Sequence, residues 1–299
     1  MNKSRVILLS ALALSVLSGC KLSSNSVSDG LKIEAIDGLS LPSYTSSNGV
    51  YTFPLSGTSK EGVRLSGSLS NGSIVIDPGS LSDNKSFEID LAGLTLSSNL
   101  DYPIYYGSKN SKLIVKALAG SSNTITYTGT TEKGAAIFSE NNLDVSGGGT
   151  LNAVTSAAGH GLRGDDLTLL DSVSINISAI HDGIHGKTLT LSSYSGTTSI
   201  ASCGSEAFDI CDNDDTAKTY KGSVTFGTSN SSFTIGKCND VFEVDNSFTI
   251  PSGVSITASE CASAAVTNLN VSAIDVTVEG SFKVNGTSLS SFAVATKAS

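Results

Sequence analysis

The amino-acid sequence predicts an all-β fold, a right-handed single-stranded parallel β-helix with rungs of 22–25 residues. Two observations lead to this prediction. The chain of 299 residues has 30 glycines and no tryptophan, and its valine, isoleucine and leucine residues come in short runs that alternate with polar residues. Alternation with period two is typical of strands that bury one face. The second half of the chain also repeats one block of sequence at a nearly constant interval.

Each repeated block opens with small residues, continues with one apolar anchor, and ends with a polar turn and two short strands. The anchors follow one another at steps of 25, 22, 24, 34 and 24 residues: Ile137, Leu162, Ile184, Phe208, Phe242 and Val266. The longest step contains an extra polar loop, 209–221. A repeat of this length with strand periodicity is typical of a β-helix whose rungs share one core. A leucine-rich repeat has a similar length, but no block contains its ladder of leucines.

The region before residue 130 is also rich in strand patterns, although its period is less regular. Strands are expected at 63–69, 73–77, 87–96 and 112–118. We interpret them as the N-terminal rungs and the cap of the same domain. The expected organisation is a signal peptide at 1–19, a serine-rich tether at 20–30 and one β-helix domain at 31–299.

The first twenty residues have the pattern of a lipoprotein signal peptide. Two basic residues precede an apolar run, 6–17, and the segment ends in Leu-Ser-Gly-Cys at Cys20. The apolar run is too short for a transmembrane helix, which takes about 20 residues. We therefore expect cleavage before Cys20, acylation of Cys20 and attachment to a membrane through lipid alone. Lys21 is not the aspartate that favours inner-membrane retention, so we expect the outer membrane, on its periplasmic or cell-surface face.

The charge of the chain argues against nucleic acid as a partner. The formal net charge is -9, and removal of the signal peptide with Lys3 and Arg5 changes it to -11. Phosphate binding depends on clustered lysine and arginine. An acidic ligand would therefore need a metal ion to bridge it to this protein.

Four cysteines follow Cys20 in the sequence. Cys203, Cys238 and Cys261 lie four or five residues before their anchors, so they should occupy one corner of three successive rungs. Strands about 4.8 Å apart are close enough for a disulfide. We expect Cys238 to pair with Cys203 or Cys261, leaving Cys211 for the remaining one. The alternative is a stack of free, buried thiols.

Alignment of the rungs on their anchors predicts a column of side chains two residues before each anchor. The column is Ala135, His160, Asp182, Glu206, Asp240 and Ala264. Stacked carboxylates repel unless solvent or a cation separates them, and calcium prefers such oxygen ligands. The predicted calcium ligands are Asp182, Glu206, Asp209 and Asp240, with Asp212 and Asp214 of the inserted loop. The alternative is that these are solvated turn residues, which aspartate favours.

The histidines and the basic residues are weaker candidates for chemistry. His160, His181 and His185 show no regular spacing of zinc ligands, so we interpret them as surface turn residues. Arg163 and Lys187 lie near the acidic column, where a basic side chain could abstract a proton from a uronate. The chain has no nucleophile motif, P-loop or convincing Cys-His pair. No catalytic residue is predicted.

Three segments carry a resemblance to a known family. They are Gly-Ala-Ala-Ile-Phe-Ser from Gly134, Gly-His-Gly-Leu-Arg-Gly-Asp-Asp from Gly159, and His-Asp-Gly-Ile-His-Gly-Lys from His181. The chain resembles the bacterial carbohydrate-binding-domain lipoprotein family with a polysaccharide-lyase-like β-helix. The resemblance implies calcium and an acidic or cellulosic polysaccharide as ligands, without established lytic activity. The alternatives are a structural or adhesive surface protein and, as the minority interpretation, a calcium-dependent polysaccharide lyase.

Overall fold

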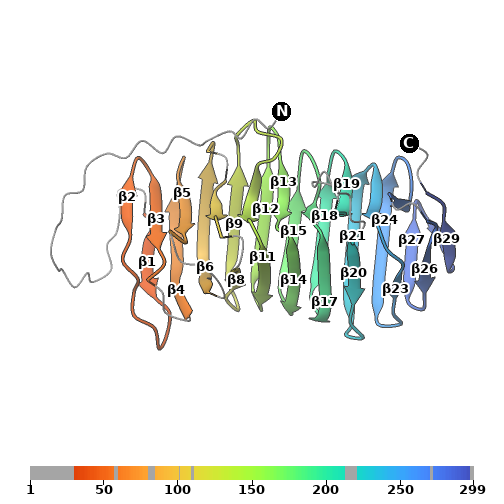
Figure 1. Ribbon diagram of the computed structural model, residues 1–299, viewed down its shortest axis with the longest axis horizontal. Helices are drawn as coiled ribbons and strands as arrows, with labels where there is room; N and C mark the ends of the chain where they lie inside the picture. Colours follow the sequence, from red (N-terminus) through yellow and green to blue (C-terminus); the bar gives the residue numbers. More distant parts are fainter. Residues whose placement is uncertain are drawn as a thin grey trace.

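The computed structural model describes residues 30–56, 60–79, 85–100, 102–108, 111–212, 221–269 and 272–296. All regular elements in these ranges are strands, which stack side by side along the long axis of the molecule (Figure 1). None of the described residues forms a helix that could cross a membrane. The all-β prediction and the parallel coil are confirmed. The signal peptide, Cys20, most of the tether and Asp214 lie outside the described residues.

Each turn of the coil contributes one strand to each of three faces. The first face is a 10-stranded sheet. Its strands are β2 (Thr45–Ser47), β3 (Val50–Pro54), β5 (Ser73–Asp77), β7 (Ile104–Tyr106), β10 (Ala135–Ser139), β13 (His160–Arg163), β16 (Ile184–Gly186), β19 (Glu206–Ile210), β22 (Asp240–Val244) and β25 (Val266–Asn268). From β3 onward all neighbours on this face are parallel.

The second and third faces belong to one 16-stranded sheet, because β6 (Ser86–Ser98) is long enough to pair with β8 on one face and β9 on the other. The second face contains β1 (Lys32–Ala35), β4 (Lys60–Leu69), β8 (Lys112–Ala117), β11 (Asn142–Gly147), β14 (Asp166–Asp171), β17 (Thr188–Tyr194) and β20 (Ser223–Phe226). The third contains β9 (Ser122–Tyr127), β12 (Thr150–Thr155), β15 (Ser174–Ser178), β18 (Thr197–Ser202), β21 (Ser231–Cys238), β24 (Val254–Cys261), β27 (Ser281–Val284) and β28 (Thr287–Ser288). A 3-stranded sheet of β23 (Phe248–Ile250), β26 (Ile274–Val278) and β29 (Phe292–Val294) completes the C-terminal end.

The predicted anchors form one buried column behind the first face. Parallel pairing joins all six in order, from Ile137 to Val266, and each is at most 6% exposed. The column continues toward the N-terminus through Ile104 and Ile74. The region before residue 130 therefore supplies N-terminal turns, as predicted, and its irregular period reflects longer connections between strands of the same face.

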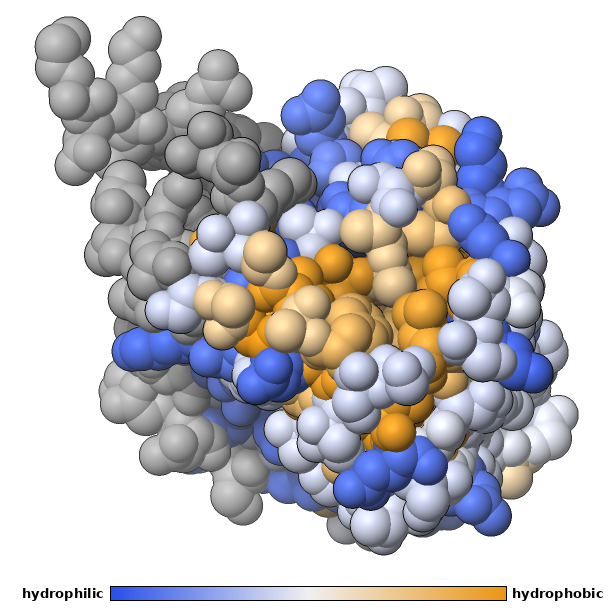
Figure 2. Space-filling view, turned by 90° about the vertical axis from the view of Figure 1, so that its right-hand side faces the viewer, coloured by the Kyte–Doolittle hydropathy of each residue, from blue (hydrophilic) through white to orange (hydrophobic). Residues whose placement is uncertain are grey.

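Apolar side chains fill the interior along its whole length. The rings of Phe208 and Phe242 stack with centroids 4.8 Å apart and planes at 15°. The view onto the C-terminal end shows apolar residues gathered in the middle of that end and polar residues around them (Figure 2). Antiparallel strands cover both ends of the stack, β1 and β2 at one end and β28 and β29 at the other.

The four described cysteines are buried, free thiols, which is the alternative considered above. The predicted stacking of cysteines is present, because Cys238 and Cys261 are register partners on β21 and β24. The described residues contain no disulfide. A bridge between these two neighbours stays a prediction for an oxidising compartment.

The core stack generates the first prediction. Phe242→Ala should lower the free energy of unfolding by about 3–5 kcal/mol, because the neighbouring rings cannot fill the cavity that it leaves. Chemical denaturation measures this change. Thr257→Ala, an exposed substitution on β24, is the control and should change stability by less than about 0.5 kcal/mol. Equal effects of the two substitutions would contradict this account of the core.

Candidate functional site

All three histidines of the chain converge on one carboxylate at the first face. Asp182 is fully buried just before β16. Its Oδ2 atom lies 3.0 Å from Nδ1 of His160, 3.1 Å from Nδ1 of His181 and 3.2 Å from Nδ1 of His185. Nδ1 of His185 is also 2.8 Å from Oδ2 of Asp209. We call His160, His181, Asp182 and His185 the histidine cluster.

The histidine cluster corrects one expectation from the sequence. His160 is only 4% exposed, and its ring lies 4.5 Å from that of His185, so these are not separate surface turn residues. His181 agrees better with the expectation, because its side chain is 48% exposed. The sequence placed His160 and Asp182 in one column, but it gave no direction for the side chain of His185.

Glycines hold the backbone of the histidine cluster in place. Gly159 has φ of +91°, and a Cβ atom there would lie 2.5 Å from the carbonyl oxygen of Gly134. The same carbonyl accepts a hydrogen bond from the amide of His160. A Cβ atom at Gly183 would lie 2.6 Å from the carbonyl oxygen of Ala207 in the next turn. The Gly-His-Gly and Asp-Gly-Ile segments are thus required by the close approach of successive turns.

Burial and mutual contact set the charges of the histidine cluster. Burial alone would raise the pKa of Asp182, but the three imidazoles beside it hold that pKa well below its usual range. Burial lowers the pKa of His160, so it is neutral at pH 7. Contact with Asp182 raises the pKa of His181. A neutral, buried imidazole beside an ionised carboxylate is an arrangement that can bind a metal ion.

The predicted acidic residues form a second group, further along the same face. Glu206 pairs in register with Asp240, and Asp209 with Glu243. Ligand oxygens of Glu206, Asp240 and Glu243 lie within 4.8 Å of one another, as do those of Asp182, Glu206 and Asp209. We call Glu206, Asp240 and Glu243 the carboxylate cluster. Glu243 was absent from the predicted ligands, although it follows its anchor as Asp209 does.

Asp212, another predicted ligand, is not part of these groups. Asp212 is buried apart from them, with its Oδ1 atom 3.7 Å from Nζ of Lys187, and its amide donates a hydrogen bond to Asp245. Asp214 lies outside the described residues.

Crowding of carboxylates is strongest at Glu206. Burial raises the pKa of Glu206 to about 7, and the neighbouring charges of Asp182 and Glu243 contribute in the same direction. Asp240 instead accepts two hydrogen bonds, from the amide of Ala264 and the hydroxyl of Thr267, both at 2.7 Å. Asp240 is therefore fixed in position by hydrogen bonds. The repulsion from neighbouring carboxylates is seen at Glu206, whose pKa it helps to raise.

An aromatic group lies on the first face, beside the histidine cluster. The rings of Tyr102 and Tyr105 stack with centroids 5.0 Å apart, and that of Phe138 lies 4.7 Å from Tyr102. The guanidinium of Arg163 lies 4.9 Å above the Phe138 ring. We call Tyr102, Tyr105, Phe138 and Arg163 the aromatic platform. The Tyr105 hydroxyl donates a hydrogen bond to Glu140, which fixes its ring.

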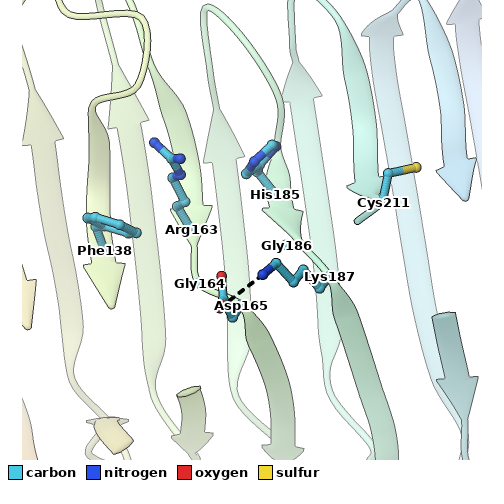
Figure 3. A pocket seen from close by; sticks show the side chains of 8 residues that line it. All are labelled: Phe138, Arg163, Gly164, Asp165, His185, Gly186, Lys187 and Cys211. Atoms are coloured by element: carbon cyan, nitrogen blue, oxygen red, sulfur yellow. Dashed lines mark ion pairs between the residues drawn. The ribbon is translucent and has the colours of Figure 1, made fainter. Parts of the chain in front are cut away.

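The aromatic platform and the acidic residues belong to one column of register partners. Its members, one from each turn, are Tyr105, Phe138, Arg163, His185, Asp209 and Glu243. Figure 3 shows three of them, Phe138, Arg163 and His185, on successive strands. The hollow between these strands has a volume of about 50 Å³, which suits a small group or an ion and is too small for a sugar ring.

The two basic residues considered for proton abstraction have other partners. Lys187 forms an ion pair with Asp165, which Figure 3 marks, and its Nζ atom lies 3.4 Å from Oδ2 of Asp165 and 3.7 Å from Oδ1 of Asp212. Nη1 of Arg163 donates a hydrogen bond to the carbonyl oxygen of Lys133 at 2.6 Å. Both side chains are positioned by these contacts.

The raised pKa of Glu206 generates the second prediction. Because the folded pKa of about 7 exceeds the ordinary value of 4.5, the folded state binds the proton more tightly, and stability should fall as pH rises between these values. In the presence of chelator, Glu206→Gln should remove the part of the stability loss between pH 5 and pH 8 that Glu206 causes. It should therefore raise the melting temperature at pH 8. Thermal unfolding at pH 5 and pH 8 measures the effect. Glu260→Gln, at an exposed glutamate of β24, is the control, and identical pH dependence in both variants would contradict the prediction.

Comparison with known proteins identifies the family of the chain and a solved structure with the same fold. No curated protein matches the chain in sequence. A solved structure described as the polysaccharide lyase-like protein from C. thermocellum, a gadolinium derivative, matches with a TM-score of 0.63 and 17% identity, over 82% of this chain and 91% of the other. At this identity the match shows a shared fold. The model of the carbohydrate-binding domain-containing protein family matches residues 52–297, and the chain therefore belongs to that family.

Proposed function

We propose that this protein binds an acidic or cellulosic polysaccharide along its first face without cleaving it, and that calcium assists the binding. The observation that carries the proposal is the single column in which aromatic, basic and acidic side chains follow one another across six turns. Family membership supports a carbohydrate ligand. The column suits an extended polymer because it runs along the long axis of the molecule.

The aromatic platform supplies the contact with the sugar rings. Tyr102, Tyr105 and Phe138 are half-buried, so part of each ring is available to the apolar face of a sugar. Rings that are already packed against one another lose little conformational entropy when a ligand binds. Arg163 adds a fixed positive charge, and its guanidinium suits a carboxylate better than a lysine would. This end of the column therefore suits a uronate residue.

The carboxylate cluster supplies the metal site. Calcium takes six to eight oxygen ligands, and three carboxylates provide up to six. The donor set of Glu206, Asp240 and Glu243 contains oxygen alone and so fits a hard cation. A bound calcium would relieve the repulsion at Glu206 and would leave coordination positions for a polysaccharide carboxylate. The bound calcium ion would then give the acidic protein a local positive charge that can bind a carboxylate of an acidic polymer.

We also propose that the protein is held at the outer membrane by lipid on Cys20. The basic start, short apolar run and Leu-Ser-Gly-Cys ending support this placement. A lipid anchor with a serine-rich tether would hold the β-helix near the membrane and leave the first face accessible to a polymer. A structural or adhesive role without a glycan is the alternative, and the next experiment distinguishes it.

The aromatic platform generates the third prediction. Phe138→Ala should reduce retention on immobilised polygalacturonate or cellulose by about 2- to 10-fold, because stacked aromatic contacts contribute roughly 0.5–1.5 kcal/mol each. Phe292→Ala removes a half-buried phenylalanine at the C-terminal end and is the matched control. Affinity electrophoresis with each polymer measures retention. No retention of the wild-type protein on any polymer would favour the structural or adhesive role.

The carboxylate cluster generates the fourth prediction. Millimolar calcium should raise the melting temperature of the wild-type protein, because an ion bound only by the folded state stabilises it by mass action. Asp240→Asn should abolish most of this rise. The exposed Asp275→Asn substitution on β26 is the control and should retain it. A rise of equal size in all three proteins would show that the carboxylate cluster is not the calcium site.

A further inference from the structure

The histidine cluster has more donors than one carboxylate oxygen can accommodate. Three Nδ1 atoms lie 3.0–3.2 Å from the same Oδ2 atom of Asp182. A carboxylate oxygen has two lone pairs and accepts about two hydrogen bonds in good geometry. Nδ1 of His160 is left without a hydrogen bond although its side chain is only 5% exposed. A buried polar atom in this state destabilises the fold unless something else binds it.

The donor set has the chemistry of a transition-metal site. Ligand atoms of His160, Asp182 and His185 lie within 4.8 Å of one another. Imidazole nitrogens with one carboxylate are typical zinc ligands, whereas calcium prefers oxygen. Zinc bonds of about 2.0–2.1 Å in tetrahedral geometry place neighbouring ligand atoms roughly 3.3 Å apart. The separations from Oδ2 in the histidine cluster are within a few tenths of an ångström of that distance.

We propose that the histidine cluster binds a zinc ion through Nδ1 of His160, Nδ1 of His185 and Oδ2 of Asp182. The half-exposed His181, whose Nδ1 atom is 3.1 Å from the same Oδ2, lies at the edge of the site and leaves the fourth ligand position to solvent. Nδ1 of His185 also lies 2.8 Å from Oδ2 of Asp209, and a zinc ion bound to this nitrogen would replace that contact. The other oxygen of Asp182 accepts a hydrogen bond from the amide of Glu206, which fixes the carboxylate. An outer contact of this kind is typical of built metal sites.

The zinc site adjoins the calcium site proposed above but uses other ligands, and it does not depend on the glycan. None of its three principal ligands belongs to the carboxylate cluster of Glu206, Asp240 and Glu243. His160 belongs to β13, whereas Asp182 and His185 belong to the following turn with β16. A zinc ion would therefore tie two successive turns together at the first face. Its loss would leave the carboxylate cluster in place.

The test uses the purified full chain after treatment with chelator. Isothermal titration with zinc alone should show about one site, and cobalt should give the intense visible absorption of tetrahedral coordination. His185→Gln should weaken zinc binding by more than the roughly 10–100-fold cost of outer-shell substitutions and should abolish the cobalt signal. Asp240→Asn is the matched control. It should keep zinc binding and the cobalt signal while losing the calcium-dependent rise in melting temperature.

The outcomes separate this proposal from the calcium proposal. Melting in chelator shows whether His185→Gln is folded, and His181→Gln provides a second, more exposed variant with a smaller expected loss. The zinc site is supported if His185→Gln loses zinc affinity but keeps the calcium-dependent rise in melting temperature. Absence of zinc binding in the wild-type protein overturns the proposal. Unchanged zinc affinity in His185→Gln also overturns it, as does loss of zinc in Asp240→Asn to the same degree.

Discussion

Parallel hydrogen bonding between successive turns is the constraint on which the rest of this structure depends. Strands about 4.8 Å apart in fixed register place each residue directly against its equivalent in the next turn. Behind the first face this superposition gives the buried column from Ile137 to Val266, and at its surface it gives the column from Tyr105 to Glu243. Core and site are therefore two consequences of one register.

The same register creates the electrostatic problem at the first face. Stacking brings Asp182, Glu206 and Asp240 onto successive turns, where like charges oppose folding. The molecule compensates for each differently. Histidines surround Asp182, hydrogen bonds hold Asp240, and burial with neighbouring charge favours the protonated form of Glu206.

The sequence predicted the features that depend on the period and missed those that depend on side-chain direction. The anchors could be aligned because each turn of the second half has nearly the same length, and this alignment also placed His160 near Asp182. It could not show that His185, which follows its anchor, turns toward the same carboxylate. The aromatic platform was missed for another reason. The step from Ile104 to Ile137 is longer than the repeat, so Tyr105 and Phe138 could not be recognised as register partners.

The antiparallel strands at the two ends have a consequence for how such a protein can change in evolution. Because β1 and β2 cover one end of the stack and β28 and β29 the other, the turns between them contact only their neighbours. Duplication of one internal block would insert a complete turn without altering either cap. Each column would then gain one position, so the length of the surface could grow or shrink by whole strand spacings while the fold is preserved.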